Sequence, residues 1–249
     1  MLRNTTAVIT CMTAAEYPFI CETVDSVLQQ SHPCEVVLLV SDYMAVKSIL
    51  GNRMECVRVK GLELSPPGLV RNYGVEESKS EWVAFLDGDD VWNPNKIERQ
   101  LRFAAKHNLS AVGCRHILVR EDGKAYFYGF ARGAPLTSSF LIRRDLMIQV
   151  PFSNSMIWED VELWKKLRAL NTADTLTDYL LRYRVRIHSL SSSLSPAKRR
   201  KYFFGRLSTV GGIRPLMLLS SRIAASLIRP IEGSKVRVRN IVSQSKVDQ

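Results

Sequence analysis

EWVAFLDGDDVWNPNKIERQL, residues 81–101, is the stretch that decides the fold. Its first six residues, 81–86, combine apolar and aromatic side chains in a way typical of a short β-strand. Asn93 and Pro94 then provide an N-cap and a first helical residue. The predicted helix turns four apolar residues inward, namely Ile97, Leu101, Ala104 and Ala105. The acidic residues in between therefore lie at the carboxyl end of a strand, where open α/β sheets bind their ligands.

The same alternation of strands and helices extends along the chain. Strands are predicted over 5–12, 35–41, 54–59, 110–119 and 138–143, and helices over 20–28 and 69–79. The nearly continuous apolar run at 35–41 is typical of a parallel strand that is covered on both faces. Asp122 and Gly123 predict a hairpin turn before an aromatic return strand at 126–128. The sequence thus predicts an α/β fold with a parallel first half and a mixed second half.

Composition limits the class of protein. A chain of 249 residues, 46% of them hydrophobic, predicts one α/β domain of about 200 residues with a tail. The five cysteines form no C-x-x-C pair and are odd in number, so we expect reduced thiols and neither a disulfide framework nor a zinc site. No stretch reaches the roughly 20 apolar residues of a membrane span, and no secretory leader is recognisable. We therefore expect a cytoplasmic protein.

Positive charge is concentrated at the end of the chain. Of the 35 lysines and arginines, 12 follow Ser195, where only Glu232 and Asp248 oppose them, so residues 196–249 carry ten of the eleven net positive charges. The serine-rich segment 189–195 predicts a hinge. We therefore expect one domain over residues 1–195 and a basic extension over residues 196–249.

Asp87 and Asp89 are the first candidates for chemistry. They flank Gly88, which lets two carboxylates and the backbone approach one ligand without a Cβ in the way. Such a pair suits Mg²⁺ or Mn²⁺, which takes one or two protein carboxylates and completes its coordination with diphosphate oxygens and water. The alternative is a pair of solvated loop carboxylates, but a position directly after a buried strand favours the metal.

Four further residues have a structural and a functional interpretation. Asp160 is either a first-turn carboxylate that stabilises a helix or a general base. Asp42 follows a strand and either caps the next helix or accepts the N–H of a nucleobase. Arg71 is either solvated or a contact to diphosphate or base, and His188 is either structural or a metal ligand.

Four stretches of the chain resemble the family 2 glycosyltransferases. They are RNYGVEESKSEWVAFLDGDDVWNPNKIERQL, SSFLIRRDL, WEDVELWKKL and LLRYRVRIHSLSSS, and they occur in family order and spacing within residues 5–195. The resemblance implies a GT-A fold, which is a Rossmann-like mixed sheet flanked by helices. It also implies an inverting transfer of sugar from a nucleotide diphosphate, with Mn²⁺ or Mg²⁺ as the cofactor.

The resemblance assigns a role to each candidate residue. Asp87 and Asp89 match the motif that binds the metal and the nucleotide diphosphate, Asp42 matches the residue that contacts the base, and Arg71 matches the arginine of the family's R-N segment. Asp160 matches the catalytic base. In some relatives a C-terminal histidine, here matched by His188, reaches the metal or the diphosphate.

Two segments depart from the family pattern. Residues 11–14 read CMTA where a P-T-Y-N-like turn is usual, and residues 41–43 read SDY where D-D-G-S is common. The Q-x-x-R-W motif of processive synthases does not occur after Ser195, so we expect addition of a single sugar. A carboxylate at Asp42 favours uridine, thymidine or guanosine donors over cytidine, and a UDP-sugar is the expected donor.

The basic extension suggests a partner. Between Pro215 and Pro230 the apolar residues recur at helical spacing, and lysines and arginines flank the segment on both sides. We expect this basic, amphipathic helix to dock on an anionic membrane surface, where it would present the site to a saccharide or lipid-linked acceptor. The alternative is that the helix packs on the catalytic domain.

Two other classes of protein also fit parts of the sequence. A nucleic-acid-binding protein would use the basic extension, but only residues 202–204 offer aromatic stacking there and no base-reading motif occurs, so no nucleic acid is expected. A catalytically silent GT-A scaffold would bind nucleotide sugars without transferring them.

Overall fold

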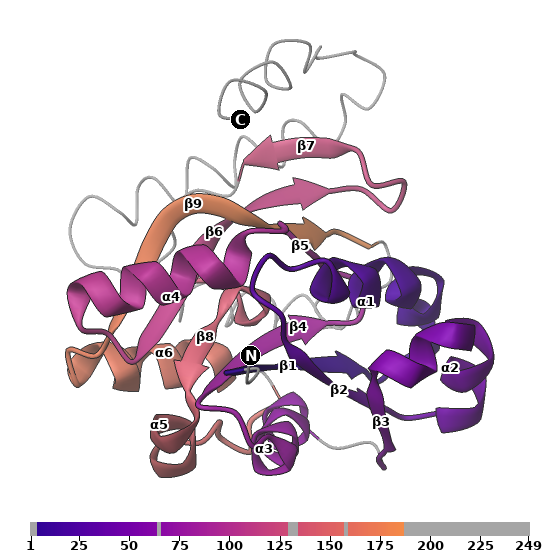
Figure 1. Ribbon diagram of the computed structural model, residues 1–249, viewed down its shortest axis with the longest axis horizontal. Helices are drawn as coiled ribbons and strands as arrows, with labels where there is room; N and C mark the ends of the chain where they lie inside the picture. The colour runs from indigo at the N-terminus through magenta and orange to yellow at the C-terminus, as the bar shows by residue number, and fades with distance from the viewer. Residues whose placement is uncertain (1–3, 64–65, 129–133, 157–158, 187–249) are drawn as a thin grey trace, which may run out of the picture. The chain divides into compact units, whose positions relative to one another are not determined.

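A computed structural model describes residues 4–63, 66–128, 134–156 and 159–186 of the chain. Within these ranges a single mixed sheet of nine strands has the order β3-β2-β1-β4-β8-β6-β9-β5, and β7 pairs with β6 (Figure 1). The parallel part consists of β1 (Thr5–Cys11), β2 (Glu35–Val40), β3 (Arg58–Gly61) and β4 (Trp82–Asp87). The mixed part consists of β5 (Val91–Trp92), β6 (Ala111–Val119), β7 (Ala125–Tyr128), β8 (Leu141–Arg143) and β9 (Ala173–Arg184).

Helices cover both faces of this sheet (Figure 1). One face packs against α1 (Ile20–Leu28), α2 (Tyr43–Leu50) and α4 (Lys96–His107). The other face packs against α3 (Pro67–Glu77), α5 (Arg144–Gln149) and α6 (Glu159–Ala169). Short 3₁₀ turns occur at Ala14–Phe19, Gly51–Cys56 and Thr137–Ser139. The predicted α/β fold with a mixed sheet flanked by helices is thereby confirmed for the described residues.

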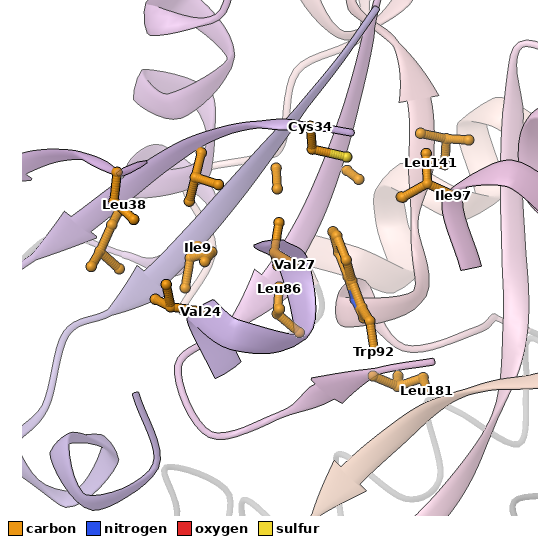
Figure 2. Packing of buried hydrophobic residues seen from close by; sticks show 14 of the residues in the cluster. Ile9, Val24, Val27, Cys34, Leu38, Leu86, Trp92, Ile97, Leu141 and Leu181 are labelled. Carbon is orange, nitrogen blue, oxygen red and sulfur yellow. The ribbon is translucent and has the colours of Figure 1, made fainter. Parts of the chain in front are cut away.

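The apolar runs form strands because successive side chains enter two different cores. In β1, Ala7 and Ile9 pack with α1 and α2, whereas Val8 between them packs with α3. Figure 2 shows the first core, where Ile9 lies near Val24 of α1. Each fully buried aliphatic side chain contributes about 1.5–3 kcal/mol. The two-sided burial therefore stabilises β1 between β2 and β4, within the parallel part of the sheet.

Three predicted elements have different bounds in the structure. The strand predicted at 54–59 begins only at Arg58, because Gly51–Cys56 forms a 3₁₀ turn. The strand predicted at 138–143 begins at Leu141, again after a 3₁₀ turn. The helix predicted from Asn93 begins at Lys96, because residues 93–95 form a turn in which the Lys96 N–H donates to Asn93 O, and the first helical bond is the one from the Arg99 N–H to Asn95 O.

Other features of the sheet and helices were only partly predicted. The Asp122-Gly123 turn is confirmed, with Gly123 at φ 77° and β7 returning antiparallel to β6. Ala105, predicted to face inward, is exposed, while Ile97 and Ala104 are buried. Three elements, β5, α5 and β9, were not predicted from the sequence, and α2 was expected only if Asp42 caps a helix.

The described residues bear on two compositional predictions. All five cysteines are free thiols, and three of them are buried. No helix within the described ranges is long and apolar enough to cross a bilayer. The 195/196 domain boundary, the basic extension and His188 lie outside these ranges, so the predictions made for them stay predictions.

Candidate active site

The order of the parallel strands creates a topological switch point between β1 and β4. From β1 the chain proceeds outward to β2 and β3, and it then returns to β4 on the other side of β1. The carboxyl ends of β1 and β4 are in register, with Thr10 opposite Asp87. Since open α/β sheets bind ligands in the crevice at such a point, Asp87 lies where a ligand is expected.

The acidic turn after β4 is held against the end of β1. The backbone N–H of Gly88 donates to Thr10 O at 2.8 Å, and Thr10 Oγ1 lies 3.2 Å from Asp87 Oδ1. A Cβ on residue 88 would lie 2.9 Å from the Cβ of Cys11. Glycine is therefore required by the close approach of β1, in addition to any approach of a ligand considered in the sequence analysis.

Arg71 of α3 joins the acidic turn to the start of α6. Its Nη2 donates to Asp87 Oδ1 at 2.8 Å, and its Nη1 donates to Glu159 Oε1 at 2.9 Å. The side chain of Arg71 is only 8% exposed, and its guanidinium carbon lies 5.7 Å from the centroid of the Phe152 ring. The structure thus shows Arg71 paired with two carboxylates, and not solvated.

Burial and neighbouring charges shift the pKa values of Arg71 and Glu159 in opposite directions. Burial works to lower the pKa of Arg71, but Asp87 and Glu159 more than offset it, so the pKa lies above its usual value. The pKa of Glu159 is raised by burial, while the Arg71 guanidinium opposes that shift. Breaking a buried pair of this kind leaves an uncompensated charge, so the contact fixes α6 relative to β4.

Asp160, the predicted general base, lies in the first turn of α6 beside Glu159. It is half-buried, and its Oδ1 accepts a hydrogen bond from the backbone N–H of Val161 at 2.8 Å. Its charge is close enough to raise the pKa of Arg71. The structure therefore brings Asp160 and the acidic turn into one electrostatic neighbourhood through Arg71.

Asp89 has a second arginine as its partner. Arg186, two residues beyond the end of β9, donates from Nε to Asp89 Oδ2, and its Nη2 lies 3.9 Å from Glu16 Oε1. The pKa of Asp89 is raised by burial, and Arg186 acts against that shift. Burial and the neighbouring Asp89 raise the pKa of Glu16 from 4.5 to about 7. Two carboxylates and one guanidinium thus face each other beside the switch point.

Glu16 and Arg186 were not predicted as site residues, although each has a recognisable signal in the sequence. Thr13 and Glu16 match the S/T-x-x-E capping box, and the Thr13 N–H donates to Glu16 Oε2 at 2.8 Å. Arg184 and Arg186 are two residues apart, the spacing that directs side chains to one side of an extended chain. Arg184 Nε does donate to the backbone oxygen of Asp89, at 2.9 Å.

Asp42, the predicted base contact, lies at the end of β2 on the other side of β1. It is the N-cap of α2, because its Oδ1 accepts a hydrogen bond from the Ala45 N–H at 2.9 Å. The side chain is exposed. Its capping role is therefore confirmed. Asp42 and Asp87 both lie at the carboxyl edge of the parallel strands.

The acidic turn suits a divalent ion that brings ligands of its own. Within the described ranges, no three His, Cys, Asp or Glu side chains gather closely enough to enclose a metal. Mg²⁺ and Mn²⁺ sites that include phosphate oxygens need only one or two carboxylates, and Asp87 and Asp89 form such a pair. The donor set fits a cation that is shared with a diphosphate and does not fit an all-protein cage.

Comparison with known families gives a match over most of the described fold. Residues 6–158 match the family described as Glycosyl transferase family 2. TuaG of Bacillus subtilis (strain 168), a glycosyltransferase assigned to teichuronic acid biosynthesis, is 27% identical over 209 residues. That match covers 76% of this chain and 82% of TuaG.

Two solved structures share the fold. Residues 1–349 of S. aureus TarS in complex with UDP-GlcNAc match with a TM-score of 0.63 and 19% identity, over 82% of this chain and 66% of that one. The chain thus spans just under two thirds of the TarS structure. The mannosyltransferase PcManGT from Pyrobaculum calidifontis, in complex with GDP-Man and Mn²⁺, matches with a TM-score of 0.63 and 14% identity, over 91% of this chain and 81% of that one.

Proposed function

We propose that this chain, which belongs to glycosyl transferase family 2, moves a single sugar from a nucleoside diphosphate to an acceptor hydroxyl with inversion at the anomeric carbon. The observation that carries the proposal is the position of Arg71. Its guanidinium bonds to Asp87 on the acidic turn and to Glu159 at the start of α6. These contacts support the proposal, because they connect the segment proposed to bind the donor with the segment that carries the proposed base.

The donor end of this site consists of carboxylates at the ends of two strands. Asp87 and Asp89 would hold Mn²⁺ or Mg²⁺ together with the diphosphate, and the ion would neutralise the charge of the leaving group. Asp42 has its Oδ1 engaged in capping α2, so a base contact would use the rest of the exposed carboxylate. An accepting carboxylate favours a uracil N–H over cytosine, and TarS was solved with UDP-GlcNAc. A UDP-sugar is therefore the proposed donor.

Asp160 is the proposed general base. The acceptor hydroxyl must lose its proton as the anomeric carbon leaves the diphosphate, and an ionised carboxylate on the opposite face of the sugar can take it. Two features support Asp160, namely its half-buried position and its place beside the Arg71 bridge. Glu159 is the less suitable base, because its Oε1 is already bonded to Arg71.

We further propose that the acceptor belongs to cell-surface glycan synthesis and is a saccharide or a lipid-linked saccharide. The name of TuaG refers to teichuronic acid biosynthesis, which supports this class. Residues 196–249 carry a net charge of +10, which would favour docking on an anionic membrane at its cytoplasmic side. His188 remains a candidate metal or diphosphate ligand on the basis of the sequence alone.

A thermal-shift screen of nucleotide sugars, with Mn²⁺ or with a chelator, tests the donor assignment. A UDP-sugar at 100 times its Kd should stabilise the protein by about 2.7 kcal/mol, and only when Mn²⁺ is present. Asp89→Asn should lose this shift. Asp145→Asn is the matched control, because this exposed carboxylate follows β8 near the opposite end of β4.

The same screen, extended to DNA and RNA and combined with a turnover assay, separates the rival classes. An equal shift in the wild type and in Asp89→Asn would remove the metal assignment. A UDP-sugar that binds without ever being turned over would indicate a catalytically silent scaffold. Binding of DNA or RNA with no response to nucleotide sugars would indicate a nucleic-acid-binding protein.

A further inference from the structure

Arg186 occupies a position that the proposed chemistry does not use. Its Nε donates to Asp89 Oδ2, and its Nη2 lies 3.9 Å from Glu16 Oε1. The side chain is 11% exposed, and its buried Nη1 has no hydrogen-bond partner among the residues that the structure describes. The guanidinium thus lies between two carboxylates, and its Nη1 has no acceptor among the described residues.

This contact conflicts with a bound divalent cation. A cation on Asp89 would have to share the carboxylate with a guanidinium, and like charges at such a distance repel strongly in a partly buried site. An unpaired buried N–H is itself unfavourable, so Arg186 would gain from a further acceptor. A diphosphate offers such an acceptor, since arginine matches phosphate oxygens with two parallel donors.

We propose that Arg186 holds Asp89 in the donor-free protein and releases it only when a diphosphate arrives. Arg186 would thereby make binding of the divalent cation conditional on the donor, so that free metal is bound poorly. The inference rests on the proposed function, because it takes Asp89 as a metal ligand. It goes beyond that function by assigning the coupling between the cation and the donor in part to Arg186, a residue that has no role in the proposed function.

A purely structural role of Arg186 is the competing explanation. In that case the ion pair only ties the segment after β9 to the acidic turn, and its loss would lower stability without raising metal affinity. The two explanations therefore predict opposite changes in Mn²⁺ binding for a variant that lacks the positive charge.

The experiment measures the Kd of Mn²⁺ by electron paramagnetic resonance of the free ion, with and without saturating UDP. Arg186→Gln should bind Mn²⁺ at least about tenfold more tightly than the wild type when UDP is absent, or about 1.4 kcal/mol. The factor by which UDP tightens Mn²⁺ binding should fall by about the same amount. Arg182→Gln is the control, because Arg182 is an exposed residue of β9 that donates to Gly123 O.

Unchanged or weaker Mn²⁺ binding by folded Arg186→Gln in the absence of UDP would overturn the proposal. If that variant does not fold, Arg186→Met takes its place, because it also removes the positive charge and leaves no polar group to bury, and unchanged or weaker Mn²⁺ binding by it likewise overturns the proposal. A wild type in which UDP does not tighten Mn²⁺ binding also refutes the coupling.

Failure of the proposed function gives a different pattern, in which the wild type does not bind UDP even with Mn²⁺. Arg186→Gln alone then decides the competition for Asp89. A gain of Mn²⁺ binding that disappears in the Asp89→Asn, Arg186→Gln double variant supports the role of Arg186, and no gain overturns it.

Discussion

Lys96 is the most sharply testable residue outside the site, because it is a fully buried lysine. It begins α4, its side chain has no exposed surface, and its Nζ has no hydrogen-bond partner among the described residues. The ammonium lies 4.1 Å from the centroid of the Trp92 ring. Burial lowers the pKa of Lys96 from 10.5 to about 8.

The lowered pKa of Lys96 gives the cost in folding stability of burying its charge. Between about pH 8 and 10.5 the folded chain binds fewer protons at Lys96 than the unfolded chain, so stability rises with pH across this window. At pH 7 the charged, buried side chain costs about 3 kcal/mol. The cation–π contact with Trp92 offsets about 0.5–2 kcal/mol of this cost, because the pair is shielded from water. Lys96→Met should therefore be more stable than the wild type by about 1–3 kcal/mol at pH 7.

Urea unfolding at pH 7 and pH 10 measures this difference. The advantage of Lys96→Met should shrink by about 2.5 kcal/mol between the two pH values, because the wild type alone gains stability there. Lys106→Met, an exposed lysine in the last turn of the same helix, should show no such change. A less stable Lys96→Met at pH 7, or a difference that does not depend on pH, would refute the reasoning.

Three further changes test separate contacts. Glu159→Gln should lose about 2 kcal/mol of stability, because it removes a charged partner of Arg71, whereas Glu162→Gln on the same helix should lose much less in urea unfolding. Gly74→Ala should lose about 1–3 kcal/mol in the same assay, because the new Cβ would lie 2.3 Å from Val8 Cγ1; no loss would show that α3 can move away from β1. Glu16 keeps its proton to about pH 7 when folded but loses it near pH 4.5 when unfolded, so this side chain should lower the stability of the wild type by about 3 kcal/mol as pH rises through this window. Stability should therefore fall less steeply in Glu16→Gln than in the wild type, where Asp89 and Glu159 contribute as well, and an identical pH profile for the two proteins would contradict this.

The strands that could be predicted most fully are those whose side chains are buried on both faces. Residues 35–41 and 81–86 read as strands because both cores demand apolar side chains, and β2 and β4 lie there. β9 was missed because its twelve residues mix exposed and buried positions, and its pairing with β6 and β5 depends on segments far away in the chain. A short 3₁₀ turn before a strand likewise leaves no periodic signal.

The candidate site likewise has a part that could be predicted from the sequence and a part that could not. The acidic turn could be predicted because a local pattern, a buried strand followed by two carboxylates, specifies it. The contacts of those carboxylates could not, because Arg71 lies 16 residues before Asp87, and Arg186 lies 97 residues after Asp89. Only the folded sheet brings these arginines to the switch point, so the charge balance of the site is a tertiary property.

The measurement that tests the central claim most directly is ¹H NMR of the sugar released from an α-linked UDP-sugar, with Mn²⁺ present and water in place of the acceptor. An inverting site releases the β-anomer as the first free sugar. Asp160→Asn should form this sugar about 10²-fold more slowly or worse, while its affinity for UDP is retained. Release of the α-anomer first, or an unchanged rate in Asp160→Asn, would contradict an inverting site with Asp160 as its base.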